Sequence, residues 1–115
     1  MNQLQVSARF PNIAPNQLAE FKVVVAELIA MSRDEPGTLR YDFFMNADET
    51  ACVVREVYAD SDACLAHLAG VGVLLGRIIP LGGGIEIECY GAPSPALMTA
   101  AAALSPKVYG HLAGK

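Results

Sequence analysis

The chain has 115 residues, of which 53% are hydrophobic and 17% charged, and its formal net charge is −4. This length predicts a single domain with one core, and the scatter of its 8 basic residues argues against the basic stripe that nucleic-acid binding requires. So apolar a composition in so short a chain indicates that a partner covers part of the surface.

The cysteines, the N-terminus and the apolar runs each exclude a further class of protein. The 3 cysteines are widely spaced, so they predict neither a disulfide framework nor a zinc site, and we expect reduced, mostly buried thiols. Residues 1–10 lack the charged start and apolar run of a signal peptide. The longest apolar runs, 23–31 and 71–81, fall short of the roughly 20 residues of a membrane span. We therefore expect a cytoplasmic protein without a membrane span.

A strand and a helix open the domain. Residues 4–10 alternate apolar with polar side chains, which is the period of a strand with one buried face. Pro11 ends this strand, and Pro15 suits the first position of a helix. Apolar residues then recur at helical spacing, at Leu18, Phe21, Val25, Leu28 and Ile29. We expect this helix to run from about residue 15 to about residue 33.

Two strands joined by a hairpin loop follow. After the turn at 35–37, residues 39–45 alternate as a strand does. The polar loop 46–50 then leads into the valine-rich segment 52–58, which should return antiparallel.

Two registers of this hairpin are possible. In one, Tyr41 lies opposite Glu56 and Leu39 opposite Tyr58 on one face, whereas Asp42 meets Arg55 as an ion pair on the other. A slip of one residue instead pairs Arg40 with Glu56 and Tyr41 with Arg55, which exchanges the faces of the side chains. In either register we expect structural roles for Arg40, Asp42 and Arg55.

The second half repeats the helix and the strand. Capping and acidic residues at 59–62 predict a helix over 63–68, which Gly70 interrupts before a further short helix over 71–79. Pro80 and the glycines at 82–84 lead into a fourth strand at 85–90. Because these glycines precede a strand, they predict a turn and not a phosphate-binding loop.

The order β-α-β-β-α-β over residues 1–91 predicts an α+β, ferredoxin-like domain with helices on one face of an antiparallel sheet. Phe44 and valines on both faces of the third strand indicate that the open face is also apolar, which favours a homodimer through that face. Residues 92–115 form an extension with a short helix over 96–104. The apolar residues of its tail predict that it docks on the domain or on its partner.

Three segments, EPGTLRY at 35–41, REVYAD at 55–60 and AHL at 66–68, resemble the antibiotic biosynthesis monooxygenase family. The resemblance covers about residues 4 to 91. It implies a dimeric α+β barrel, in which the sheets of two subunits pack face to face. Family members include oxygenases that use neither metal nor flavin, quinol oxygenases, haem-degrading enzymes and proteins without an assigned reaction, so the fold alone does not choose among them.

The resemblance implies two candidate functions. One is a cofactor-independent monooxygenase that acts on a small phenolic or quinol-like compound, and the other is a non-catalytic small-molecule-binding or stress-associated dimer. His67 stands where the haem-degrading branch carries a tryptophan, and Gln5 and Ser7 stand where it places an asparagine, which argues against haem degradation. Nucleotide and flavin motifs are missing, so we expect no cofactor or metal.

His67 is the candidate catalytic base, because an imidazole titrates near neutral pH. The competing hypothesis is structural, with the ring hydrogen-bonded to a neighbouring strand. Arg77 either holds an anionic substrate oxygen or has a structural role, in which it extends into solvent or caps the partner's chain. The remaining candidates, expected to line a pocket for a small aromatic molecule, are Tyr41, Phe43, Glu56 and Tyr58.

Overall fold

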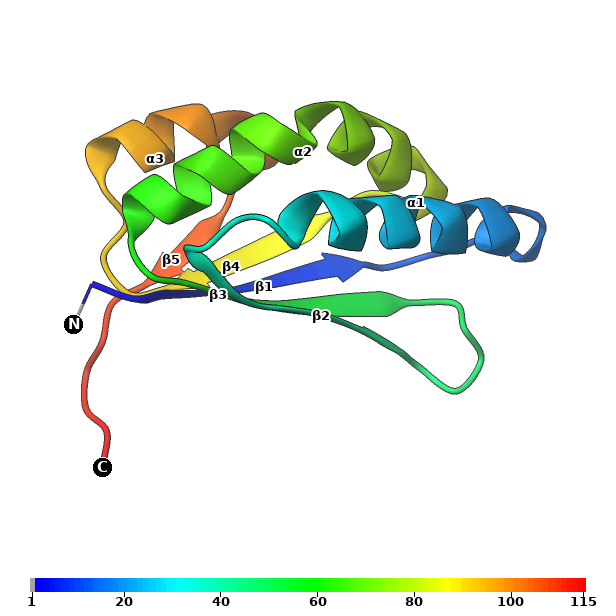
Figure 1. Ribbon diagram of the computed structural model, residues 1–115. Helices are drawn as coiled ribbons and strands as arrows, with labels where there is room; N and C mark the ends of the chain where they lie inside the picture. The colour runs from blue at the N-terminus through cyan, green and yellow to red at the C-terminus, as the bar shows by residue number, and fades with distance from the viewer. Residues whose placement is uncertain (1) are drawn as a thin grey trace.

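The computed structural model describes residues 2–115 and places three α-helices on one face of a five-stranded sheet (Figure 1). The strands are β1 (Leu4–Phe10), β2 (Thr38–Met45), β3 (Cys52–Tyr58), β4 (Glu86–Tyr90) and β5 (Lys107–Tyr109), and the α-helices are α1 (Leu18–Ser32), α2 (Ser61–Leu81) and α3 (Pro95–Ala100). Their order in the sheet is β2-β3-β1-β4-β5, with only β4 and β5 parallel. The α+β, ferredoxin-like prediction is confirmed, and in this chain the sheet is open and not closed into a barrel.

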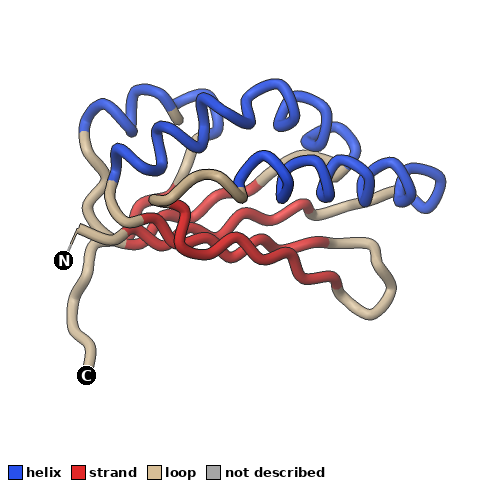
Figure 2. The backbone as a smooth tube through the Cα atoms, in the orientation of Figure 1, coloured by secondary structure: helices blue, strands red, loops and turns tan. Residues whose placement is uncertain are grey.

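The core fills the space between the sheet and the helix layer, which Figure 2 shows as two separate layers. Alternate residues of β1 point into it, because successive side chains of a strand face opposite sides. On α1, Phe21 is 1% exposed and its ring meets the ring of Phe10 edge to face, with centroids 5.4 Å apart. The predicted helix at 15–33 is therefore confirmed, except that its first turn, 15–17, is a 3₁₀ turn.

Helix α2 corrects the prediction of two short helices. It runs unbroken through Gly70, which lies on its exposed side. Buried residues recur along the other side at helical spacing, at Cys64, His67, Val71, Leu74 and Ile78. Their burial outweighs the roughly 1 kcal/mol that a helical glycine costs. By length and composition alone α2 could cross a membrane, but this buried side packs against the sheet and α1 as in a core helix.

The hairpin adopts the register that pairs Tyr41 with Glu56 and Asp42 with Arg55. Two details of that prediction are wrong. Thr38, and not Leu39, lies opposite Tyr58, because a β-bulge between Thr38 and Arg40 leaves Leu39 52% exposed. The carboxylate of Asp42 accepts a hydrogen bond from Nε of Arg40 at 2.7 Å, and Arg40 lies on the same face two residues away.

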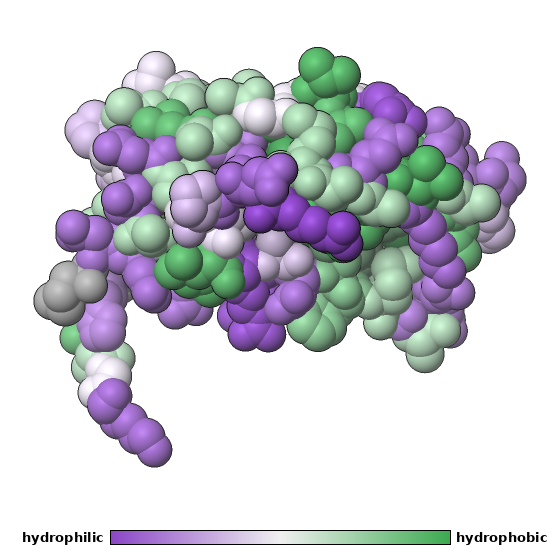
Figure 3. All heavy atoms as spheres, in the orientation of Figure 1, coloured by the Kyte–Doolittle hydropathy of each residue, from purple (hydrophilic) through white to green (hydrophobic). Residues whose placement is uncertain are grey.

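The C-terminal extension docks on the domain through an unpredicted strand. After α3 and a 3₁₀ turn (Ala102–Leu104), β5 pairs in parallel with β4 at the sheet edge. The Gly91 N–H donates to the Tyr109 carbonyl at 2.9 Å, and the Ser94 N–H donates to Oγ of Ser61 at 2.9 Å. Only the last residues extend away from the body (Figure 3), where Leu112 is 98% exposed.

The open face of the sheet is more polar than expected. The strand registers place Phe44, Val53 and Val57 there, as predicted. The same face also carries charged side chains of every strand, namely Arg9, Arg40, Asp42, Arg55, Glu86, Glu88 and Lys107. Val54, on the opposite face of β3, is 2% exposed and points into the core.

The turn before β4 should tolerate no side chain at Gly83. Its φ is +73°, and an added Cβ would lie 2.4 Å from the carbonyl oxygen of Asn12. We expect Gly83→Ala to lower the free energy of unfolding by about 1–3 kcal/mol, measured by urea denaturation. The control is Gly76→Ala in α2, where a Cβ meets nothing within 4 Å, and this change should stabilise by about 0.5–1 kcal/mol. Equal changes in the free energy of unfolding for the two variants would contradict the strain at Gly83.

Candidate active site

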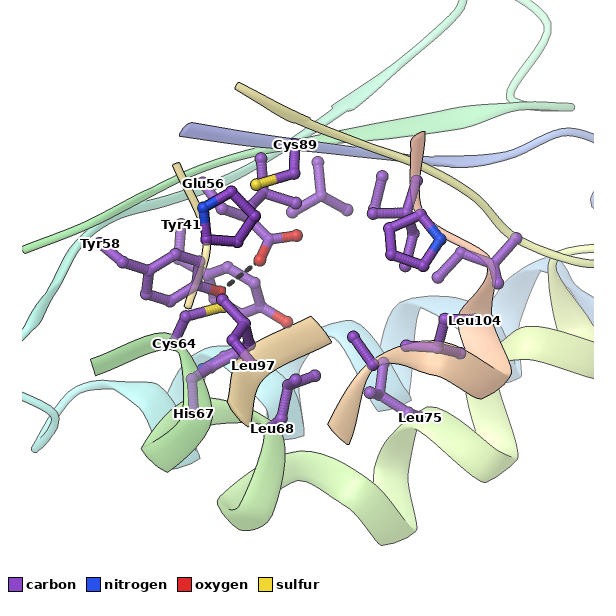
Figure 4. A pocket seen from close by; sticks show the side chains of 18 of the residues that line it. Tyr41, Glu56, Tyr58, Cys64, His67, Leu68, Leu75, Cys89, Leu97 and Leu104 are labelled. Carbon is purple, nitrogen blue, oxygen red and sulfur yellow. Dashed lines mark hydrogen bonds between the residues drawn. The ribbon is translucent and has the colours of Figure 1, made fainter. Parts of the chain in front are cut away.

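A cavity of about 70 Å³ lies between the sheet and the helices (Figure 4). Most of its lining is apolar, and a polar cluster of Tyr41, Glu56, Tyr58 and His67 forms one part of its wall. Cys64 and Cys89 also line it. For comparison, an engineered apolar cavity of about 150 Å³ binds benzene, so a ring compound requires this cavity to widen.

The sheet brings three members of the polar cluster together. Tyr41 and Glu56 are cross-strand partners on β2 and β3, and Tyr58 lies two residues beyond Glu56, so all three side chains face the helices. From α2 above them, the ring of His67 packs against Tyr41 with centroids 4.8 Å apart and against Tyr58 at 5.4 Å. Helix and hairpin packing thus builds the cluster.

His67 is bound to a carboxylate and not to a strand. Its Nδ1 lies 2.8 Å from Oε1 of Glu35, in the turn before β2, and the residue is only 3% exposed. The same Glu35 oxygen accepts from the Thr38 hydroxyl at 2.9 Å. Because a carboxylate only accepts, Nδ1 carries a proton and donates it to Glu35. Within residues 2–115, Nε2 has no hydrogen-bond partner.

Glu56 is the second titratable group in the cluster. The Tyr58 hydroxyl donates a hydrogen bond to Oε1 of Glu56. Burial raises the pKa of Glu56 to about 7, although the hydrogen bond from Tyr58 opposes the rise. This carboxyl group therefore gains and loses a proton close to neutral pH.

The tyrosines and thiols of the cavity stay protonated at neutral pH. Burial, followed by the nearby Glu56, raises the pKa of both Tyr41 and Tyr58 above the ordinary value. Burial likewise raises the pKa of Cys64 to about 12 and that of Cys89 above its ordinary value. The tyrosines can therefore serve as hydrogen-bond donors, whereas the thiols are poor nucleophiles.

The structure brings together His67, Tyr41, Phe43, Glu56 and Tyr58, all of which line the cavity. Arg77 does not line it, which corrects that expectation. Its side chain is 45% exposed and donates to Glu27 of α1 at 2.9 Å, because its position on α2 faces away from the sheet. The cavity lining contains no lysine or arginine among the described residues 2–115.

Sequence reasoning missed Glu35 and the C-terminal residues of the cavity wall. The sequence places Glu35 in a turn and in the family-like segment 35–41 without a role in the site, and 32 positions separate it from His67. The EPG turn immediately before a strand, together with a histidine on a following helix, is the only signal that pointed to the pair. The alanine-rich extension gave no sign of facing a cavity.

The raised pKa of Glu56 makes stability depend on pH. From pH 4.5, the ordinary pKa, to pH 7 the folded state holds more protons than the unfolded state, so stability falls as pH rises and levels off above 7. The expected fall is on the order of 3 kcal/mol. Glu56→Gln should remove this component, which urea denaturation of both proteins at pH 5 and pH 8 would measure. A Gln variant with the same pH dependence would contradict the buried, protonated carboxyl.

Comparisons with known proteins show the family and the fold of this chain. The sequence model of the antibiotic biosynthesis monooxygenase family matches residues 5–73. Among solved structures, MupZ from Pseudomonas fluorescens is similar with a TM-score of 0.79 and 24% identity, covering 98% of this chain and 92% of that chain. At this identity, the likeness to MupZ shows the fold alone.

Two further structures are similar. A putative antibiotic biosynthesis monooxygenase from Caulobacter crescentus CB15 has a TM-score of 0.69 and 28% identity, covering 81% of this chain and 92% of that chain. SnoaB from Streptomyces nogalater, a cofactor-independent oxygenase solved as the mutant N63A, has a TM-score of 0.63 and 25% identity. The match covers 82% of this chain and 96% of that chain. Curated protein sequences give no significant match. The family model matches more than half of the 115-residue chain, and the chain therefore belongs to the antibiotic biosynthesis monooxygenase family.

Proposed function

We propose that this chain is a cofactor-independent monooxygenase that oxidises a small phenolic or quinol-like compound in the cavity between sheet and helices. Family membership supports the class of reaction. The observation that carries the proposal is His67, whose Nδ1 is held by Glu35 while Nε2 remains without a partner beside an apolar cavity. Such an imidazole is a general base positioned by a carboxylate.

The reaction requires a substrate whose anion can reduce dioxygen. In its keto tautomer such a compound carries an activated CH₂ group, for which the balance is R₂CH₂ + O₂ → R₂C=O + H₂O. Nε2 of His67 takes the first C–H proton, and the resulting anion gives its electrons to dioxygen as a C–O bond forms. The Tyr41 hydroxyl can donate a hydrogen bond to the developing anion.

The second half of the reaction breaks the O–O bond. Protonated Glu56 gives its proton to the terminal oxygen of the peroxide anion. The remaining C–H proton then returns to Glu56 as the O–O bond breaks, and the departing hydroxide takes the proton from His67 to form water. Both residues end in their starting states, and a raised pKa suits Glu56 for giving and regaining a proton near neutral pH.

A non-catalytic small-molecule-binding or stress-associated protein is the alternative. The small volume of the cavity, about 70 Å³, favours it, since no ring compound fits without movement. The carboxylate bound to His67 favours an enzyme, because a purely structural histidine could have used a backbone partner.

The test is oxygen consumption by the purified protein with a panel of hydroquinones, anthrones and naphthols. We expect uptake with at least one compound and the transfer of one ¹⁸O atom from ¹⁸O₂ to product, detected by mass spectrometry. Arg77→Ala is the matched control and should leave the rate unchanged, because Arg77 lies outside the cavity. No uptake with any compound of the panel would reject the proposal in favour of the alternative.

Homodimerisation through the open sheet face remains a prediction, as does a cytoplasmic location. Exposed apolar side chains on that face support dimerisation, since Phe44 is 49% exposed and Tyr109 is 48% exposed and stacks on Tyr90. Light scattering at micromolar concentration should give twice the 12.1 kDa chain mass. A monomer at that concentration would contradict it.

A further inference from the structure

The C-terminal segment 93–106 forms one wall of the cavity. Its lining residues come from α3, from the 3₁₀ turn and from the prolines on either side, namely Pro93, Leu97, Met98, Ala101, Leu104 and Pro106. Figure 4 shows Leu97 beside the polar cluster and Leu104 at the far end, near Leu75. The segment therefore runs along the length of the cavity.

This wall is attached more loosely than the others. The sheet and helices α1 and α2 form the main core, and their displacement would expose large buried side chains. The segment is held by the bond from the Ser94 N–H to Ser61, by Leu97, which is 4% exposed, and by the three residues of β5. Because the cavity is too small for a ring compound, one of its walls must move to admit one. Moving this wall breaks fewer buried contacts than moving the sheet, α1 or α2.

The charge of the cavity restricts what it can accept. It contains the Glu56 carboxyl and Nε2 of His67, and no lysine or arginine lines it within residues 2–115. A carboxylate or phosphate ligand would lose its hydration without gaining a partner of opposite charge. A hydroxyl group can donate to either Glu56 or His67.

We propose that segment 93–106 is the specificity-determining wall of the site, and that it moves outward to admit an uncharged molecule with a hydroxyl group at one end. The hydroxyl meets the polar cluster, and the apolar body lies against Leu97, Met98 and Leu104. This inference rests on the proposed function for the identity of the site. Its test uses binding alone, so that the proposed function can fail while this inference holds, and this inference can fail while the proposed function holds.

The first experiment compares the binding of 1-naphthol, 1-naphthoate and 1-methoxynaphthalene to the full chain by isothermal titration calorimetry. We expect 1-naphthol to bind about tenfold or more tightly than 1-naphthoate, which is charged, and more tightly than the ether, which cannot donate a hydrogen bond. Equal affinities, or no binding of 1-naphthol, would overturn the inference whether or not the protein consumes oxygen.

A matched pair of variants tests the wall itself. Leu104→Trp fills the far end of the cavity and should weaken 1-naphthol binding about tenfold or more, whereas Ala103→Trp, on the exposed side of the same turn, should leave it unchanged. Thermal denaturation checks that both variants fold. If the two variants bind 1-naphthol equally well, the segment does not determine specificity.

Movement of the wall is tested by a disulfide clamp. Ser61→Cys with Ser94→Cys joins the segment to α2 at residues that are already hydrogen-bonded, and the native cysteines are buried. The oxidised protein should bind 1-naphthol about tenfold more slowly in stopped-flow measurements, and reduction should restore the rate. An association rate that is the same in both redox states would overturn the outward movement.

Discussion

Replacing His67 with glutamine is expected to lower the turnover number by about 10²- to 10⁴-fold, which is the usual contribution of a positioned general base. Glutamine nearly preserves the size of the side chain and can still donate to Glu35, but it cannot take a proton at neutral pH. The rate of oxygen uptake with the best substrate of the panel measures the effect. Binding of 1-naphthol should change far less, because the cavity keeps its shape.

Glu35→Gln separates the positioning of His67 from its chemistry. Glu35 touches Nδ1 of His67 and does not line the cavity, so it is a positioning residue. A neutral amide no longer stabilises the imidazolium that forms when Nε2 takes a proton, so the rate should fall less than in His67→Gln and its pH optimum should move downward. Full activity in both variants would show that His67 is structural.

Replacing Phe21 with alanine is expected to lower the free energy of unfolding by about 3–5 kcal/mol, the usual range for a buried phenylalanine. Phe21 is 1% exposed and contacts Phe10 edge to face, so the change leaves a cavity where α1 packs on β1. Urea denaturation measures the change in the free energy of unfolding. Most domains of this size are stable by only about 5–15 kcal/mol, so this variant should unfold well below the wild-type midpoint.

Val23→Ala, on the same helix, is the control for Phe21. Val23 is 53% exposed, and exposed substitutions usually change stability by less than about 0.5 kcal/mol. A loss at position 23 as large as the loss at position 21 would mean that the outer side of α1 is covered, which a single chain would not explain.

The strands and the hairpin were predictable because their signals are local. Alternation in β1 identified its buried face, and turn residues on both sides of the hairpin limited its register to two choices. The pairing of Tyr41 with Glu56 followed from one of these, and it assembled most of the polar cluster. The bulge at Leu39 did not follow, because bulges depend on how the strand twists at the sheet edge.

The remaining features depend on contacts between distant segments. The bond between Glu35 and His67 needs α2 to lie over the turn before β2, which no spacing in the sequence specifies. Gly70 suggested a break in α2, but packing of Val71 and Leu74 on the core kept the helix continuous. β5 was missed because three residues are too few to show an alternating pattern.

A crystal structure of the protein with 1-naphthol tests most directly whether the cavity beside His67 is the functional site. We expect the naphthol oxygen within hydrogen-bonding distance of Nε2 of His67 or of the Glu56 carboxyl, its rings against Leu97 and Leu104, and segment 93–106 displaced outward. Naphthol bound on the open face of the sheet, with the cavity unchanged, would contradict the account.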